Sequence, residues 1–167
     1  MTNKVLAPFD VKLQEFAARA LRERGVELKL GYSVAEVRPD GVEFGNGEFL
    51  KAGVVVWATG VTVPKAVADW GLPQGRGGRI TVDAELRVIG KKNIFAAGDT
   101  AITPDALPQL AQPALQGGKH IGKSISAMVI GRPIHPFTYH DKGTRATVGR
   151  RAAVADLALI RGKHLQL

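Results

Sequence analysis

The first regular pattern of apolar and polar positions is a helical one near the N-terminal end of the chain. Over residues 9–25, apolar side chains recur at intervals of three and four residues, and the stripe consists of Leu13, Phe16, Ala17, Ala20 and Leu21. Asp10 precedes this stripe as a helix N-cap, and Gly25 follows it as a stop signal. The spacing predicts an amphipathic helix with one face in a core.

Residues 26–60 change to the two-residue period of β-strands. Apolar and charged residues alternate from Val26 to Leu30, which predicts a half-exposed strand directly after the helix. Three short apolar segments follow, at residues 34–37, 42–44 and 48–50. Because Asn46-Gly47 is a strong hairpin signal, we expect an antiparallel meander there. The apolar run 54–57 then predicts a further strand.

The second half of the chain contains a short apolar run, a glycine turn and a long helical pattern. Ile94 to Ala97 are predicted to form a strand buried on both faces of a parallel sheet. Gly98 and Asp99 follow at its carboxyl end, and helical spacing then runs from about Ala111 to Ile130. After Pro136, further short strands are expected at residues 137–140, 146–148 and 152–159.

Gly98 and Asp99 are the first candidates for a ligand site. Open α/β sheets bind ligands beyond the carboxyl ends of their parallel strands, and a following helix directs its free N–H groups and positive dipole end to the same place. Gly98 permits close approach of a ligand to the backbone, and the Asp99 carboxylate can accept hydrogen bonds from sugar or ribityl hydroxyls. An ordinary turn is the alternative, since this dipeptide is common in turns.

Two features of the long helix favour the ligand site over the ordinary turn. Gln112 and Gln116 are four residues apart, so they share one helix face. Gly117 and Gly118 lie inside the helix, where each costs about 1 kcal/mol relative to alanine. Such a cost indicates close approach of another backbone or of a ligand.

The composition excludes several classes of chemistry. The 167 residues include no cysteine, which excludes thiol redox, disulfide and thiolate–metal mechanisms. No metal site is expected either, because metal-ligand spacing is absent among His120, His135, His140 and His164. The pattern G-x-G-x-x-G does not occur, so the sequence contains no loop of the kind that holds a dinucleotide pyrophosphate.

The charge of the chain is concentrated at its C-terminal end. The formal net charge is +8, and residues 119–167 contain nine of the 23 basic residues but two of the 15 acidic ones. A basic end indicates lipid headgroups or nucleic acid as a partner, or else a solvated surface. Its aromatic residues, Phe137 and Tyr139, are too few for base stacking, so no nucleic-acid partner is expected. We expect no signal peptide, since Met1 to Lys4 lead into no apolar h-region, and no membrane span, since no apolar stretch approaches ~18 residues.

Three blocks of the sequence together resemble one family. They are Val56 to Gly60, Asn93 to Asp99 with the helical segment Ala111 to Gln116, and Tyr139 to Asp156. These blocks resemble the type II NADH:quinone oxidoreductases, the single-subunit flavoprotein NADH dehydrogenases of the pyridine nucleotide-disulfide oxidoreductase superfamily. The first two are shared across the superfamily, whereas the glutamine-containing helix and the last block point to this branch.

The resemblance implies an α/β fold, namely a partial two-dinucleotide-binding-domain (FAD/NAD(P)-binding, Rossmann-like) fold with an antiparallel β-meander and the start of a C-terminal α+β domain. Residues 1–60 would be the back half of the NAD(H)-binding domain and 61–135 the back half of the FAD-binding domain. Residues 136–167 would start the membrane-associating domain. A complete member needs two G-x-G-x-x-G fingerprints, so we expect a truncated C-terminal-half fragment that is inactive alone.

The resemblance also implies the activity of the parent enzyme. There, NADH reduces FAD by hydride transfer and the reduced flavin passes two electrons to a membrane quinone, so the implied cofactors are FAD and NAD(H). Gln112 and Gln116 would border the flavin ring and the quinone pocket as the catalytic residues. The implied cofactor-binding residues are Thr59, Gly60, Gly98, Asp99, Leu110, Ala111 and Lys142.

The resemblance further implies partners and a location. The parent enzyme is cytoplasmic and peripheral on the inner face of the membrane, so an anionic membrane surface joins quinone as an implied partner. A homodimer, or a separate chain with the missing N-terminal half, would complete the fold. Two alternatives stay open: a non-catalytic, self-associating module that binds no flavin, and another flavoprotein reductase such as a ferredoxin or rubredoxin reductase. The lack of cysteine excludes disulfide reductases and sulfide:quinone oxidoreductases.

Overall fold

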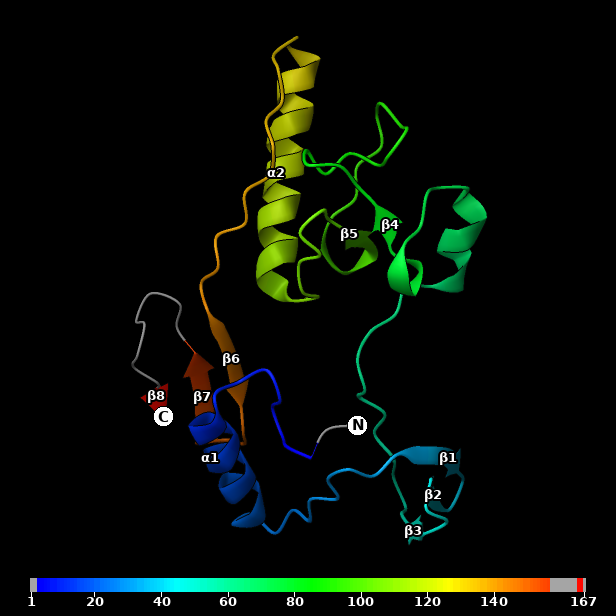
Figure 1. Cartoon of the computed structure of the whole chain (residues 1–167), viewed down its shortest axis with the longest axis vertical. Coiled ribbons are helices and arrows are strands. Elements are labelled where there is room, and N and C mark those ends of the chain that lie inside the picture. The colour runs from blue at the N-terminus through cyan, green and yellow to red at the C-terminus, as the bar shows by residue number, and fades with distance from the viewer. Residues whose placement is uncertain (1–2, 157–164, 167) are drawn as a thin grey trace. The chain divides into compact units, whose positions relative to one another are not determined.

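A computed structural model describes residues 3–156 and 165–166 (Figure 1). These residues fall into two compact units, one made of the chain before Thr59 together with the chain from Lys142 onward, the other of Thr59–Asp141. The long helices are α1 (Val11–Arg22) in the first unit and α2 (Ala111–Val129) in the second. The helical prediction is therefore confirmed for both segments. Short 3-10 turns occur at Lys65–Trp70, Arg76–Gly78 and Gly98–Thr100.

The first unit contains two antiparallel sheets. One has the order β1-β2-β3, and the other has the order β6-β7-β8. Their strands are β1 (Val34–Arg38), β2 (Gly41–Phe44), β3 (Phe49–Lys51), β6 (Thr144–Thr147), β7 (Ala153–Asp156) and β8 (Leu165–Gln166). The predicted meander at 34–50 is thus confirmed, as are the strands predicted near 146–148 and 152–156. The predicted continuation to residue 159 lies outside the described residues.

Helix α1 begins at the residue that the sequence indicates. The Asp10 side chain accepts a hydrogen bond from the backbone N–H of Lys12 at 2.9 Å, which satisfies one of the free N–H groups of the first turn. Leu13 and Ala17 are fully buried and pack in one cluster with Val148 and Val154 of the C-terminal hairpin. The apolar stripe of the first helix therefore forms one core with β6 and β7, which begin more than 120 residues later.

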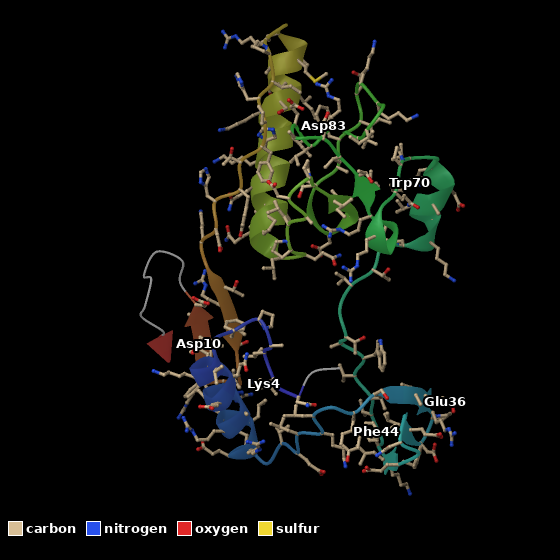
Figure 2. The ribbon with its side chains drawn as sticks, viewed as in Figure 1. Lys4, Asp10, Glu36, Phe44, Trp70 and Asp83 are labelled. Atoms are coloured by element: carbon tan, nitrogen blue, oxygen red, sulfur yellow. The ribbon has the colours of Figure 1, made fainter. Side chains whose placement is uncertain are left out.

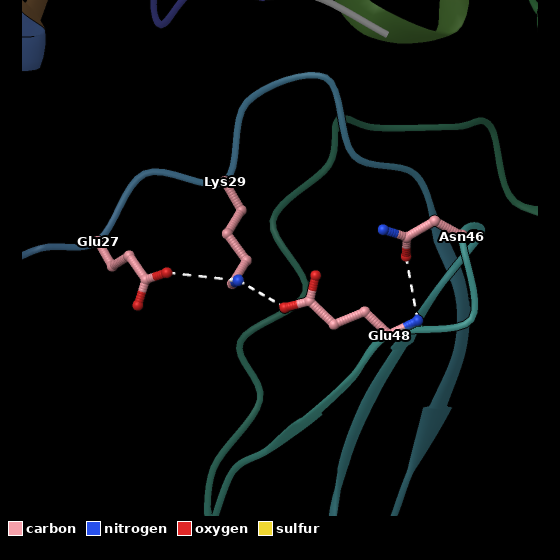
Figure 3. Close-up of polar contacts among 4 residues, drawn as sticks. All are labelled: Glu27, Lys29, Asn46 and Glu48. Atoms are coloured by element: carbon pink, nitrogen blue, oxygen red, sulfur yellow. Dashed lines mark hydrogen bonds and ion pairs between the residues drawn. The ribbon is translucent and has the colours of Figure 1, made fainter.

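An ion pair ties the segment before the meander to the turn between β2 and β3. The Lys29 ammonium lies 2.6 Å from Glu48 Oε1 and 3.3 Å from Glu27 Oε1 (Figure 3). Asn46 Oδ1 accepts a hydrogen bond from the Glu48 N–H at 3.1 Å, which closes the predicted Asn-Gly hairpin turn. The paired charges raise the pKa of Lys29 and lower the pKa of Glu48, in each case chiefly through the hydrogen bond between the two side chains.

The core of the second unit surrounds a short parallel pair, β4 (Ile80–Thr81) and β5 (Ala101–Ile102). Its buried members are Val67, Ile80, Val82, Leu86, Val88, Ala96 and Ala101. Asp83 shapes the turn beside this core, because its Oδ1 accepts hydrogen bonds from the N–H groups of Glu85 at 3.0 Å and Arg87 at 2.8 Å (Figure 2 labels Asp83). Ile121 of α2 packs against the same cluster.

Four predicted strands are wrong, namely those at residues 26–30, 54–57, 94–97 and 137–140. Residues 26–30, 54–57 and 137–140 are extended or irregular, and no described strand pairs with them. Strands need hydrogen-bonded neighbours, which is why apolar periodicity alone does not produce them. Residues 94–97 form no parallel strand because the turn after Val88 folds the chain back on itself. Backbone hydrogen bonds then join this segment to its own predecessor, from Val88 N to Ile94 O at 2.8 Å and from Ala96 N to Leu86 O at 3.1 Å.

The predicted fold class is nevertheless confirmed: the fold mixes helices with short sheets, including the antiparallel meander. No helix in the part of the chain that the structure describes is long and apolar enough to cross a membrane.

Candidate functional site

The candidate site lies where the Gly98–Thr100 turn meets the N-terminus of α2. Gly98 has a φ of +69°, in the left-handed region that favours glycine. A Cβ built on Gly98 would lie 3.0 Å from the Cβ of Ala114 in α2. The space that glycine leaves at this point is therefore occupied by the helix.

Gly117 repeats this close approach one turn further along α2. A Cβ built there would lie 3.0 Å from the Cβ of Ala97 and 3.4 Å from Leu86 Cδ1. Gly118 has no atom within 4 Å of its built Cβ. Gly117 thus packs closely against the side chains of Ala97 and Leu86 and not against another backbone, while Gly118 faces open space.

The turn and the loop after it are held by side-chain hydrogen bonds to the backbone. Gln109 Nε2 donates to the Asp99 carbonyl at 3.1 Å, and Thr100 Oγ1 donates to the Ala97 carbonyl at 3.2 Å. The Asp99 side chain is exposed, and no hydrogen bond or ion pair of its carboxylate is found within residues 3–156. This carboxylate can therefore accept hydrogen bonds from a ligand.

The N-terminus of α2 adds donors to the same place. Leu110 is the N-cap residue, and its side chain makes no capping hydrogen bond. Ala111 and Gln112 lie in the first turn of α2, so their backbone N–H groups have no hydrogen-bond acceptor within the helix. Pro113 has no backbone N–H group. Ala111 is exposed and Leu110 is 42% exposed, so an acceptor group of a ligand can reach this end of the helix.

The interior side of the turn is filled. A cavity of about 10 Å³ is lined by Leu86, Ala97, Gly98, Gly117 and Phe137, among others, which is near the smallest volume that holds one water molecule. A cofactor-sized ligand therefore fits on the exposed side of Asp99 and not beneath Gly98.

The two predicted catalytic glutamines lie side by side on α2. Gln116 Nε2 is 3.3 Å from Gln112 Oε1. Gln116 is also joined to the backbone of His140, since Nε2 donates to the His140 carbonyl at 2.9 Å and Oε1 accepts from the His140 N–H at 3.1 Å. Sequence reasoning missed the His140 peptide, because nothing in the sequence marks a contact between residues 24 positions apart.

Residues 136–141, here called the return segment, run along α2 and have two further attachments. The Phe137 N–H donates to the Ala84 carbonyl at 2.7 Å, and the Phe137 ring lies 5.4 Å from the His120 ring. Tyr139 Oη donates to Asp141 Oδ1 at 3.5 Å. Burial, with the Asp141 charge, raises the pKa of Tyr139.

The remaining predicted site residues are Thr59, Gly60 and Lys142. Thr59 and Gly60 are exposed, and the built Cβ of Gly60 has no neighbour within 4 Å. Lys142 begins the C-terminal part of the other compact unit. The structure thus brings together Gly98, Asp99, Leu110, Ala111, Gln112 and Gln116 within one unit. The roles predicted for all these residues, and the three predicted domain boundaries, stay predictions.

Comparison with known proteins decides the family. Residues 1–118 match the family described as pyridine nucleotide-disulphide oxidoreductase. The chain belongs to this family. Among its relatives within the pyridine nucleotide-disulphide oxidoreductases is the type II NADH:quinone oxidoreductase Ndh of Mycobacterium tuberculosis, 35% identical over 92% of this chain and 35% of the relative. A type II NADH:quinone oxidoreductase of Staphylococcus saprophyticus is 32% identical over 98% of this chain and 42% of its own length.

Solved structures show the same fold. The chain superposes on NDH2 from Plasmodium falciparum in complex with NADH with a TM-score of 0.84, at 17% identity, over 99% of this chain and 49% of that one. This match concerns the fold, and the sequence relatives confirm the resemblance to type II NADH:quinone oxidoreductases. The chain spans between a third and about two fifths of the length of the M. tuberculosis and S. saprophyticus relatives.

Proposed function

We propose that this chain supplies the quinone-facing part of the flavin site of an NADH:quinone oxidoreductase. The observation that carries the proposal is the uncapped N-terminus of α2, which contains Gln112 and contacts the turn that holds the exposed Asp99 carboxylate. Its relatives named as type II NADH:quinone oxidoreductases support the same activity. The proposed cofactors are FAD and NAD(H), and the proposed electron acceptor is a quinone.

The residues present fit one end of FAD. The Asp99 carboxylate can accept hydrogen bonds from ribityl hydroxyls, and the N–H groups of Ala111 and Gln112 can donate to the carbonyl oxygens of the flavin pyrimidine ring. No G-x-G-x-x-G loop accompanies them, so the sequence offers no backbone cradle for the pyrophosphate. This chain therefore suits the flavin ring and ribityl chain, and the phosphates need residues from another chain or segment.

The chain's own groups would position the reactants while the bound flavin carries the electrons between NADH and quinone. The turn held by Gln109 and Thr100 would fix Asp99, and Gly98 and Gly117 would seat α2 against the turn. An amide N–H group of the glutamine face would donate a hydrogen bond to a quinone carbonyl. Such bonds strengthen as negative charge accumulates on the oxygen during reduction.

Membrane attachment belongs to the same proposal. The C-terminal excess of basic residues suits an anionic membrane surface, and a quinone dissolved in lipid requires an enzyme at that surface. We place the assembled enzyme on the cytoplasmic, inner face of the membrane. A second copy of the chain, or a chain with an N-terminal half, would complete the nucleotide sites.

A second candidate function has a specific observation in its favour. Val54 and Val56 are both 82% exposed in an extended segment that pairs with no described strand. An apolar, uncharged, unpaired segment of this kind favours strand addition between copies. The chain would then be a self-associating module that binds no flavin.

A visible absorption spectrum separates the two functions. The full chain is incubated with excess FAD, passed through gel filtration and compared with the Asp99→Ala and Asp105→Ala variants. Asp105 is another exposed aspartate of the same unit and serves as the matched control. Retained flavin in the unaltered chain and in Asp105→Ala, lost in Asp99→Ala, supports the flavin site. A folded chain that retains no flavin contradicts that function and leaves the self-associating module.

A further inference from the structure

The amide group of Gln116 is already engaged within the protein. A primary amide has two N–H donors and one carbonyl oxygen. Gln116 uses one donor on the His140 carbonyl at 2.9 Å and the other on Gln112 Oε1 at 3.3 Å, and its oxygen accepts from the His140 N–H at 3.1 Å. Gln116 therefore has no free donor for a ligand unless one of these bonds breaks.

The His140 peptide determines which way both glutamines face. A backbone N–H can only donate and a backbone carbonyl can only accept, so the oxygen and nitrogen of Gln116 cannot be exchanged. The second N–H of Gln116 must then meet an acceptor. Gln112 can satisfy it with Oε1, whereas the flipped Gln112 amide would place two NH2 groups against each other. The Gln112 oxygen is thus held toward Gln116.

With the two amide groups oriented in this way, the NH2 group of Gln112 is the donor available to a ligand. Within residues 3–156, no hydrogen bond from Gln112 Nε2 is found, and Gln112 is half-buried in the first turn of α2. A group that can only donate selects an acceptor on its ligand. The carbonyl oxygen of a quinone is such an acceptor, and it gains negative charge as it is reduced.

We infer that Gln116 is a positioning residue, which clamps the return segment through the His140 peptide and thereby orients Gln112 as the hydrogen-bond donor to a quinone carbonyl. The part about quinone rests on the proposed function, but the clamp does not. The clamp assigns different roles to two side chains that the sequence presents as an equivalent pair. It also links the return segment to the substrate-facing amide through one peptide group.

Three variants separate the two roles. Gln116→Glu keeps the length of the side chain but removes both donors, so it repels the His140 carbonyl and Gln112 Oε1. Gln112→Glu keeps the acceptor for Gln116 and removes the donor offered to the ligand. Gln112→Ala removes both and controls for packing.

The clamp is tested first, on the full chain without ligand. Side-chain amide exchange measured by NMR should be slower for the Gln116 NH2 than for the Gln112 NH2. Chymotrypsin cleavage after Tyr139 should accelerate several-fold in Gln116→Glu, because the return segment is released, and should stay unchanged in Gln112→Glu and Gln112→Ala. The inference would be overturned if the two side-chain amides exchanged at equal rates. It would also be overturned if Gln116→Glu folded but did not change the rate of cleavage.

The donor is tested with a water-soluble benzoquinone as the probe, added to the flavin-loaded chain or, if flavin is not retained, to the chain alone. The Gln112 NH2 signals should shift and the Gln116 signals should not. Loss of one hydrogen bond in Gln112→Glu should weaken quinone binding about tenfold. A shift of the Gln116 signals instead would overturn the inference while leaving the proposed function intact. A chain with a protected Gln116 amide that binds no quinone would refute the proposed function and the donor role, and would leave the clamp standing.

Discussion

A Cβ built on Gly117 would lie 3.0 Å from the Cβ of Ala97, so helix α2 approaches the segment before the Gly98–Thr100 turn as closely as a glycine allows. Neither neighbour can readily move, since Ala97 Cβ is attached to the backbone and Leu86, at 3.4 Å, is almost fully buried. We expect Gly117→Ala to destabilise the second unit by about 1 kcal/mol, because overpacking of roughly 1–3 kcal/mol exceeds the helix-propensity gain of about 1 kcal/mol.

Gly118→Ala is the matched control for this prediction, and urea unfolding is the measurement. Its built Cβ has no atom within 4 Å, so the helix-propensity term acts alone and stability should rise by up to about 1 kcal/mol. Two substitutions of the same kind in adjacent positions should therefore change the free energy of unfolding in opposite directions. An increase for both would mean that α2 can shift away from Ala97.

A second prediction concerns the core that α1 shares with the C-terminal hairpin. Leu13 is fully buried against this core, so Leu13→Ala should lower the free energy of unfolding by about 2–5 kcal/mol. Val11→Ala, on the exposed side of the same helix, should change it by less than about 0.5 kcal/mol. Comparable losses in the two variants would contradict the packing of α1 on β6 and β7.

The Lys29–Glu48 pair predicts a dependence on pH. The folded-state pKa of Glu48 is lowered, so its contribution to stability is present above the ordinary glutamate pKa and is lost as the pH falls through the lowered value. The pKa of Lys29 is raised, so its contribution is complete below the ordinary lysine pKa and is lost as the pH rises through the raised value.

An NMR titration of the Glu48 carboxyl measures this effect. In Lys29→Met the Glu48 pKa should move back upward, and in the unaltered chain added salt should move it the same way, because both charges are at the surface. A Glu48 pKa that neither change moves would show that other neighbours of the carboxyl, such as the Asn46 and Tyr32 side chains, keep it low instead of Lys29.

The exposed segment 54–57 yields a prediction about self-association. Val56→Lys should reduce association of the chain with itself, measured by size-exclusion chromatography with light scattering, because a charge opposes strand pairing. Val129→Lys changes a side chain of nearly equal exposure, 81% against 82%, on a helix, and should leave association unchanged. An equal effect of both variants would indicate general hydrophobic contact and not pairing through residues 54–57.

The elements that the sequence predicted well depend on interactions between near neighbours. Asp10 caps α1 through the Lys12 N–H, and the Asn46 turn closes the meander through Glu48, each within two residues of sequence. The glutamine pair on α2 is likewise a four-residue relationship. Such contacts follow from helix and turn geometry, so the residue types and their spacing are enough to predict them.

The sequence by itself determined both long helices, the meander, the excess of basic residues and the motifs that indicate the family. Only the tertiary structure decided that residues 94–97 fold back on residues 86–88, that α1 shares its core with a hairpin from the opposite end of the chain, and that Gln116 holds the His140 peptide. The physical reason is that a strand or a clamp requires a partner distant in sequence. The pattern of apolar and polar residues records that a group needs a partner, but the identity of the partner is set when the chain packs.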